Sequence, residues 1–267
     1  MALILKNVTY KNIIKNINYK FENGKVYTIL SSSEIEKEIF AKIIVDIVKK
    51  YSGNITINCS KEEISYVHKD TNTFIGNTCY EELSLCLMKY GYKPITVSKK
   101  IEALLKMLYL DKNIKSINPK VLSNSEKKLL SIGVALINNS KILVLNEPTL
   151  YLDAYNKKRI IKIFKKIAKR YNKIIIILTN DVLLSEEASD NYILLNNGSI
   201  FCEGRTKDLP QINDKLFKCN IPIPQIMNFI NMACKKKNIS LDKTYDIKEL
   251  MKDVYRNVKW YESKLYK

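Results

Sequence analysis

Three continuous apolar segments of strand length constrain the fold of this 267-residue chain more than any other feature. They are Val26–Leu30, Lys141–Asn146 and Ile174–Thr179, which are rich in β-branched residues or leucine. A polar stretch and then a helical pattern follow each of them. Strands without polar alternation are typical of parallel sheets, because helices bury both faces of such a sheet. The sequence therefore predicts an α/β architecture in which these segments share one parallel sheet.

Helical patterns occupy much of the remaining chain. Glu34–Lys50 and Asn156–Tyr171 carry apolar residues three or four positions apart. Between Thr78 and Asn138 the strand pattern disappears. Three helical patterns follow one another there, at Cys79–Tyr90, Ser98–Leu110 and Ser123–Ile137. We therefore expect an all-helical insertion, at about residues 78–138, within the α/β domain.

A change of pattern near residue 210 indicates a domain boundary. Extended segments and glycine turns precede this point, and Pro210 closes the region of strands. Pro222 and Pro224 open a tail in which the patterns are mainly helical. We expect a main domain at residues 1–210 and a small, mainly helical C-terminal domain at residues 211–267.

The chain is strongly basic, with 45 lysines and arginines against 27 acidic residues and a net charge of +18. Only four of the 45 are arginines, at positions 159, 170, 205 and 256. Nucleic-acid sites favour bidentate arginine, so we expect no nucleic-acid partner. Two explanations of the charge stay open: an AT-rich coding sequence, which yields lysine, isoleucine and asparagine, or attraction to anionic lipid at the inner membrane face.

We find no candidate membrane segment or metal site in the sequence. The longest apolar stretch lies within Ile174–Leu178, far below the roughly 20 residues that span a bilayer. Residues 1–6 lack the basic leader of a signal peptide, so a cytosolic chain is expected. The cysteines at 59, 79, 86, 202, 219 and 234 include no C-x-x-C pair, and His68 is the only histidine. We expect reduced thiols and no bound metal.

The order of several motifs carries a family resemblance. A strand, a polar loop and a helix bearing Lys37 are followed far downstream by Lys141–Thr149 and then by Leu152 and Asp153. This order resembles the nucleotide-binding subunit of ABC transporters. The resemblance implies a RecA-like P-loop NTPase fold with an antiparallel β layer and a helical insertion, and ATP hydrolysis as the activity.

Within that superfamily the chain is most similar to the ATPase A-components of energy-coupling factor (ECF) transporters, which power vitamin and metal uptake. The similarity rests on Phe74–Glu82, on Leu122 and Ser123 ahead of a helix, and on the tail around Lys215–Pro224. In that family the A-components hold helices of a membrane-embedded T-component beside the helical insertion. The resemblance therefore implies that Phe74, Glu81 and Glu82 contact such a partner. An ordinary loop entering a helix is the alternative for this segment, because acidic residues are favourable in a first turn.

The phosphate loop departs from the family pattern. A working loop reads G-x-x-x-x-G-K-[ST], in which glycines let backbone N–H groups converge on phosphate, and the hydroxyl binds magnesium. The matching residues here are Ser31, Ser32, Ser33, Glu34, Ile35, Glu36, Lys37 and Glu38. Only the lysine is retained, and three carboxylates surround it. Two like charges about 4 Å apart repel by roughly 4 kcal/mol at an effective dielectric near 20, so this loop disfavours ATP.

The other positions of the resembled reaction centre are also altered. Asn146 stands at the Walker B aspartate, Lys69 at the glutamine that reaches the metal, and Asn180 at the switch histidine. An amide supplies no charge to hold magnesium. Glu147, at the position of the catalytic glutamate, is retained. Without a metal or phosphate this carboxylate has nothing to activate, and we interpret it as a vestigial strand-end residue.

The family signature L-S-G-G-Q is replaced here. Its positions hold Leu122, Ser123, Asn124, Ser125 and Glu126. Ser123 and Glu126 have the spacing of a capping box, in which a serine and a glutamate satisfy the open N–H groups of their own helix. Ser33 and Glu36 have the same spacing. We therefore predict that the helix carrying Lys37 begins near Ser33, with Glu36 folded back onto its N-terminus. Both sites that would attract phosphate are then occupied by carboxylates of the protein.

These observations favour a catalytically degenerate ABC-type subunit that serves a structural or regulatory role in an ECF-like transporter. We expect no bound cofactor, and a heterodimer with an active ATPase in preference to a homodimer. Asp153, in the D-loop position, then lies at the dimer interface or caps the following helix. The membrane T-component would be the second partner, and the chain would lie peripherally at the cytoplasmic face of the cell membrane. The alternative is an active ATP hydrolase that uses ATP and Mg²⁺ at a site containing Lys37 and Glu147.

Overall fold

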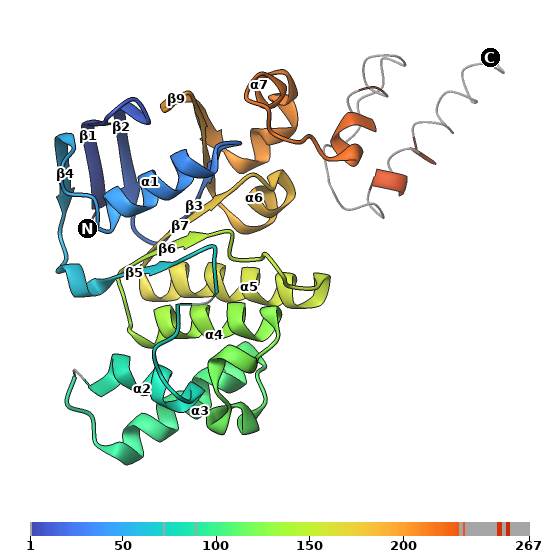
Figure 1. Ribbon diagram of the computed structural model, residues 1–267. Helices are drawn as coiled ribbons and strands as arrows, with labels where there is room; N and C mark the ends of the chain where they lie inside the picture. The colour runs from blue at the N-terminus through green and yellow to red at the C-terminus, as the bar shows by residue number, and fades with distance from the viewer. Residues whose placement is uncertain are drawn as a thin grey trace.

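The computed structural model describes residues 2–71, 73–88, 90–229, 232, 250–252, 255 and 256. These residues form two β-sheets with helices between and around them, and a helical lobe at one end (Figure 1). No helix in this part of the chain is long and apolar enough to cross a membrane. The five cysteines that the structure describes form no disulfide, and Cys234 lies outside the described residues.

The central sheet has six strands. The order across it is β5 (Ile64–Val67), β6 (Ile142–Asn146), β7 (Ile174–Thr179), β3 (Val26–Leu30), β8 (Asn191–Asn196) and β9 (Ser199–Arg205). All pairs are parallel except β8 with β9, which is an antiparallel hairpin edge. Strands β3, β6 and β7 are buried along their whole length. The three apolar segments therefore share one parallel sheet, as the sequence predicts.

A smaller antiparallel sheet lies over one face of the central sheet. It consists of β2 (Ile14–Glu22), β1 (Ala2–Tyr10) and β4 (Ser52–Ile57). Helix α1 (Glu34–Ile44) packs in the same hydrophobic core, with Phe40 and Ile44 among residues of β1, β2 and the central strands. This arrangement confirms the expected antiparallel layer. A three-residue loop joins the carboxyl end of β3 to the start of α1.

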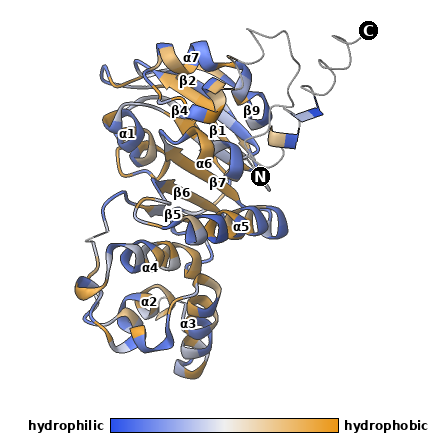
Figure 2. Cartoon of the chain, turned by 90° about the vertical axis from the view of Figure 1, so that its right-hand side faces the viewer, coloured by the Kyte–Doolittle hydropathy of each residue, from blue (hydrophilic) through white to orange (hydrophobic). Residues whose placement is uncertain are grey.

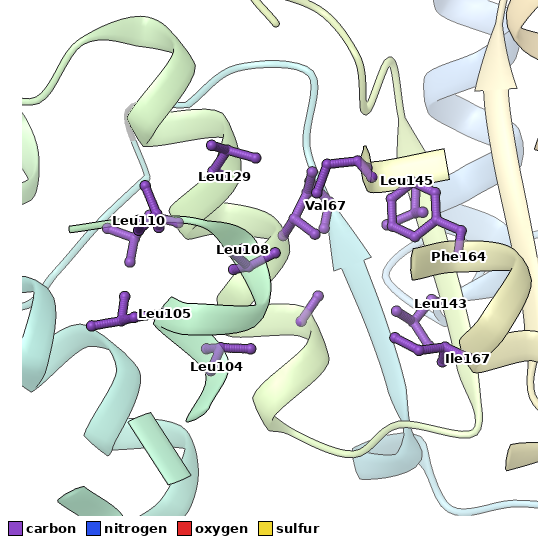
Figure 3. Packing of buried hydrophobic residues seen from close by; sticks show 14 of the residues in the cluster. Val67, Leu104, Leu105, Leu108, Leu110, Leu129, Leu143, Leu145, Phe164 and Ile167 are labelled. Carbon is purple, nitrogen blue, oxygen red and sulfur yellow. The ribbon is translucent and has the colours of Figure 1, made fainter. Parts of the chain in front are cut away.

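Helices cover the other face of the central sheet. These are α4 (Asn124–Ile137) and α5 (Ala154–Tyr171), which lie side by side in Figure 1. Leu143 and Leu145 of β6 pack with Phe164 and Ile167 of α5 in one core (Figure 3). Strands β6 and β7 are mainly hydrophobic in Figure 2, which fits a sheet buried on both faces.

The helical insertion is present as expected. It contains α2 (Cys79–Met88), α3 (Pro94–Leu108) and α4, joined by two short 3₁₀ helices at Lys112–Ser116 and Pro119–Val121. Leu104, Leu105, Leu108 and Leu129 pack together inside it (Figure 3). Helix α3 starts four residues earlier than the apolar pattern predicts, because Pro94 occupies the first helical position, where its missing N–H costs nothing.

Helix α1 is shorter than the sequence predicts. The apolar spacing continues through Ile47 and Val48, yet the helix ends at Ile44. Asp46 adopts a left-handed conformation with φ of 59°, and the N–H groups of Ile47 and Val48 both donate to the carbonyl of Lys42. These bonds satisfy helix-end carbonyls in the manner of a left-handed C-terminal cap. The apolar side chain of Val48 then packs on the core from the turn.

The described part of the region after residue 210 packs on the main domain. Helix α6 (Val182–Ala188), a 3₁₀ helix at Thr206–Gln211 and α7 (Asn213–Lys218) surround the end of β3. Leu216, Ile221 and Met227 share a core with Leu30. The rest of the expected C-terminal domain lies mostly outside the described residues, so the boundary near residue 210 stays a prediction.

Candidate functional site

A three-residue loop, Ser31–Ser33, joins β3 to α1. Helix α1 begins at Glu34 with Ser33 as its N-cap, so the predicted early start of the helix is confirmed. The Ser33 hydroxyl accepts a hydrogen bond from the backbone N–H of Glu36 at 3.3 Å, and the backbone N–H of Ser33 donates to the Ser31 hydroxyl at 3.0 Å. Serine side chains therefore satisfy N–H groups that a phosphate would otherwise bind.

The capping box expected at Ser33 and Glu36 is only half formed, although the Glu36 side chain does fold back onto the loop ahead of the helix. Its carboxylate does not reach back to the N–H of Ser33; it accepts from the Ser31 hydroxyl at 2.7 Å and from the backbone N–H of Gly198 at 2.8 Å. Gly198 lies in the β8–β9 turn, on the other side of the loop. Spacing along the helix could not reveal this partner, because it is 162 residues away. Glu36 therefore ties the loop to the edge hairpin of the central sheet.

Lys37 is the buried centre of an ion-pair cluster. Its side chain has no exposed surface, and its ammonium lies 2.6 Å from a carboxylate oxygen of Glu34 and 2.5 Å from one of Glu147. Glu34 is one turn back on the same helix, whereas Glu147 follows β6, two strands away in the sheet. The carboxyl ends of parallel strands meet at one edge, which brings the two distant residues together. The lysine that resembles a phosphate ligand is thus paired with two carboxylates of the protein itself.

Two further side chains complete this cluster. The Lys69 ammonium lies 2.9 Å from the second oxygen of Glu34, and the Thr179 hydroxyl donates to the second oxygen of Glu147 at 2.7 Å. The cluster holds two carboxylates and two ammonium groups, so its formal charge is zero. Burial raises the pKa of the Glu34 carboxyl, but Lys37 and Lys69 outweigh this effect and hold that pKa below its usual value. The Glu34 carboxylate in turn raises the pKa of Lys69.

The two asparagines of the predicted centre lie in different surroundings. Asn146 is 4% exposed at the end of β6, and its side-chain oxygen is buried without a hydrogen-bond partner among the described residues. Asn180 is exposed. The residue before it, Thr179, is the one that contacts Glu147. Sequence reasoning missed Thr179 because a strand-end threonine carries no signal of its own.

The predicted capping box at α4 is present. The Glu126 carboxylate accepts from the backbone N–H of Ser123 at 2.9 Å, and the Ser123 hydroxyl accepts from the N–H of Glu126 at 3.3 Å. Asn124 is exposed and Ser125 half-buried in the first turn. Asp153 has a similar role in α5, since its carboxylate accepts from the N–H of Asn156 at 2.8 Å. The helix-capping interpretation of Asp153 is therefore the one that the structure displays.

The sequence pattern that defines ABC transporters matches residues 14–150, which is just over half of the chain. The chain belongs to the ABC transporter family. A protein of Clostridium tetani named as an ABC transporter ATP-binding protein is 29% identical over 231 residues, covering 78% of this chain and 51% of that protein. The chain thus spans about half the length of that relative. The energy-coupling factor transporter ATP-binding protein EcfA1 of Mesomycoplasma hyopneumoniae (strain 7448) is 29% identical over 264 residues, 91% of each chain.

Solved structures of ABC proteins share the fold. The structure of cbiO1 from Clostridium perfringens, part of the ABC transporter complex cbiONQ, is superposable with a TM-score of 0.71 at 23% identity, covering 86% of this chain and 98% of that one. The dimeric bacterial ABC transporter cassette MJ0796 gives a TM-score of 0.69 at 24% identity, covering 76% of this chain and 98% of the cassette. These likenesses establish the ABC cassette fold.

The residues present do not fit the magnesium nucleotide that the ABC fold implies. At the position of the metal-binding hydroxyl, Glu38 is paired with Lys42 at 2.5 Å. Asn146 offers a neutral amide oxygen, which is a weaker magnesium ligand than a carboxylate. Within the described residues no three His, Cys, Asp or Glu side chains are grouped as metal ligands. We therefore derive no hydrolytic step at this site.

Two glutamates hold the segment Phe74–Glu82, which the sequence predicts to face a membrane partner. The Glu82 carboxylate is buried and accepts from the backbone N–H groups of Ile75 and Gly76 at 2.9 and 2.7 Å. Glu81 accepts from the N–H of Asn77 at 2.9 Å. Phe74 is buried, whereas the Ile75 side chain is 81% exposed. The loop therefore presents an apolar residue to solvent, and two carboxylates from the first turn of α2 fix its backbone.

Lys128 is a buried charged residue that sequence reasoning missed. It lies on α4 in the helical lobe and has no exposed surface. Its ammonium donates to the carbonyl oxygens of His68 and Lys69 at 3.0 and 2.7 Å. Burial lowers the pKa of Lys128 to about 8. The only available signal was its place among apolar neighbours, Leu129 and Leu130, on a helix that must bury one face.

Proposed function

We propose that this chain is a catalytically degenerate ATP-binding subunit of an ECF-like uptake transporter, which acts as a structural or regulatory partner of an active ATPase. It would bind the membrane-embedded T-component peripherally, at the cytoplasmic face of the cell membrane. Three observations support this role: the ABC fold, the similarity to EcfA1 along 91% of the chain, and the altered phosphate loop.

The pairing of Lys37 carries the proposal. A bound triphosphate would have to displace both Glu34 and Glu147 from the ammonium, and the freed carboxylates would then face the phosphates. Each such contact between like charges at about 4 Å costs roughly 4 kcal/mol at an effective dielectric of 20. The loop provides few N–H groups in compensation, because Ser31 and Ser33 side chains accept from those of Ser33 and Glu36.

Calorimetry with Mg-ATP tests the proposed loss of nucleotide binding. We expect no detectable heat of binding at about millimolar Mg-ATP, since a dissociation constant of 1 mM corresponds to only about −4 kcal/mol. Lys37→Ala should therefore change nothing. Lys42→Ala, at a half-buried position of the same helix that has no contact with Glu34 or Glu147, is the matched control. A micromolar dissociation constant that Lys37→Ala abolishes and Lys42→Ala preserves would instead establish the alternative, an active ATP hydrolase.

The proposed partner role depends on the exposed side chain of Ile75. Ile75 is exposed on a loop whose backbone Glu82 holds in place. We expect Ile75→Asp to reduce co-purification with the T-component, because it places a charge in an apolar contact. Glu62→Asp, an exposed conservative change, serves as the control. Light scattering across concentration, with the active ATPase homologue added, should give a heterodimer. A strictly monomeric chain, or assembly unaffected by Ile75→Asp in folded protein, would contradict this role.

A further inference from the structure

A groove between α3 and α5 is separate from the nucleotide region. It has a volume of about 520 Å³, within the range of a ligand pocket. Its apolar lining comes from Met107, Ile163 and Ile167, and exposed tyrosines border it. None of the lining residues is acidic. Nothing in the proposed transporter role uses this groove.

Arg159 is held between two tyrosines at the groove. Its guanidinium carbon lies 3.3 Å from the ring centre of Tyr109 and 4.0 Å from that of Tyr155. Contact with two aromatic rings restrains the guanidinium, while its N–H groups lie around its edge and can form paired hydrogen bonds to a carboxylate or a phosphate. Tyr109 ends α3 in a left-handed conformation with φ of 58°, an uncommon backbone state for a bulky residue.

Three further cations follow Arg159 along α5. Lys162, Lys166 and Arg170 all line the groove, three or four positions apart on one face of the helix. At a rise of 1.5 Å per residue, the row from Arg159 to Arg170 is about 16 Å long. Helix α5 contains no acidic residue, and no salt bridge to these four cations occurs within the described residues. The row is thus an uncompensated positive field beside an apolar floor.

We propose that this groove binds an acidic amphipathic helix of a partner protein. The floor would take the apolar face of such a helix, and Arg159, Lys162, Lys166 and Arg170 would pair with its carboxylates. Tyrosine and arginine are the residues most enriched in the energetic centres of protein interfaces. Two of the four arginines in this lysine-rich chain are found here.

Other anionic occupants fit the groove less well. Arg159 covers one face of Tyr109 and one of Tyr155, which removes stacking surface that a single-stranded nucleic acid would use. A membrane surface is flat and contacts protruding residues, not the floor of a groove. A second copy of this chain carries a net charge of +18, so charge repulsion opposes self-association.

Fluorescence anisotropy with a labelled, designed 18-residue helix tests the proposal. The probe carries leucine at positions i, i+3, i+4 and i+7 and glutamate on the flanking positions. A second peptide has serine in place of leucine at the same charge. We expect Lys162→Gln/Lys166→Gln to weaken binding of the first peptide about tenfold, and Arg159→Ala by a similar factor. The matched control, Lys158→Gln/Lys165→Gln, removes the same charge from α5 outside the groove and should change affinity less than about twofold.

Three outcomes would overturn the proposal. Equal weakening by the groove and control variants would show binding to net charge alone. Equal affinity for the serine peptide would show that the apolar floor takes no part. Tighter binding of a uridine 18-mer or of vesicles containing 30% phosphatidylserine, lost in the same groove variants, would assign the groove to nucleic acid or lipid. Circular dichroism of each variant checks that it is folded. None of these results depends on nucleotide binding.

Discussion

Lys37 and Lys128 are both completely buried, yet their ammonium groups are stabilised in different ways. Lys37 has two carboxylate partners, whereas Lys128 has two backbone carbonyl oxygens and no acidic partner within 4 Å among the described residues. Burial lowers the pKa of Lys128 to about 8, because the two carbonyl oxygens replace only part of the hydration that the ammonium would have in water. The comparison teaches that direct carboxylate contacts neutralise the buried cation at the start of α1, whereas the buried cation on α4 has only carbonyl oxygens in direct contact.

Removing a partner of Lys37 should give the largest effect. Glu147→Ala leaves a buried ammonium with one carboxylate partner and removes the acceptor of the Thr179 hydroxyl, so we expect a loss of about 3 kcal/mol in the free energy of unfolding. The double variant Lys37→Met/Glu147→Gln removes both charges together and should cost about 1 kcal/mol. Urea unfolding measures both. Glu38→Ala breaks the more exposed pair with Lys42 and is the control; a loss equal to that of Glu147→Ala would refute a special role for the Lys37 cluster.

The buried ammonium of Lys128 should make the free energy of unfolding depend on pH. The folded pKa of about 8 lies below the ordinary value of 10.5, so the unfolded chain binds more protons between these values and stability rises with pH. We expect a gain of about 2 kcal/mol between pH 7.5 and 9.5 that Lys128→Met abolishes. Urea unfolding of both proteins across this range measures the difference. Lys158→Met, at an exposed position, should keep the full gain; a parallel pH course in Lys128→Met would show that Lys128 is not the titrating group.

Glu34 should give the smallest effect, because its side chain is 45% exposed. Lys37 and Lys69 lower its pKa against the effect of burial, so its contribution is present above the unfolded value of 4.5 and is lost as the pH falls through the folded value. Glu34→Gln should cost about 0.5 kcal/mol at pH 7 after allowance for solvent screening. One molar salt should reduce this cost, and acid unfolding should begin at a higher pH. A cost at pH 7 that equals that of Glu147→Ala would show that both carboxylates are equally buried partners.

The sequence was sufficient for the three central strands of the sheet and insufficient for the ion pairs. Continuous apolar runs locate β3, β6 and β7, because a strand that is buried on both faces does not alternate between apolar and polar residues. The caps of α1 and α4 are local, so Ser33 and Ser123 are found from spacing alone. Glu147 pairs with a residue 110 positions away, and the acceptors of Lys128 are backbone atoms. Neither partnership has a local signature. The Glu34–Lys37 spacing of three was visible, although three neighbouring glutamates left the actual partner open.

The two hydrogen bonds of Glu36 make it difficult to convert this loop into a working phosphate loop by mutation. A glycine at position 36, as in a working phosphate loop, would leave the Gly198 N–H without its acceptor and the Ser31 hydroxyl with only the more distant Ser33 carbonyl oxygen. A buried polar group without a partner costs about 1–3 kcal/mol. The gain in phosphate affinity would not follow until Glu34 had also changed, because that carboxylate would still neutralise Lys37. A glycine at position 36 alone would therefore lower the stability of the fold without creating a phosphate site.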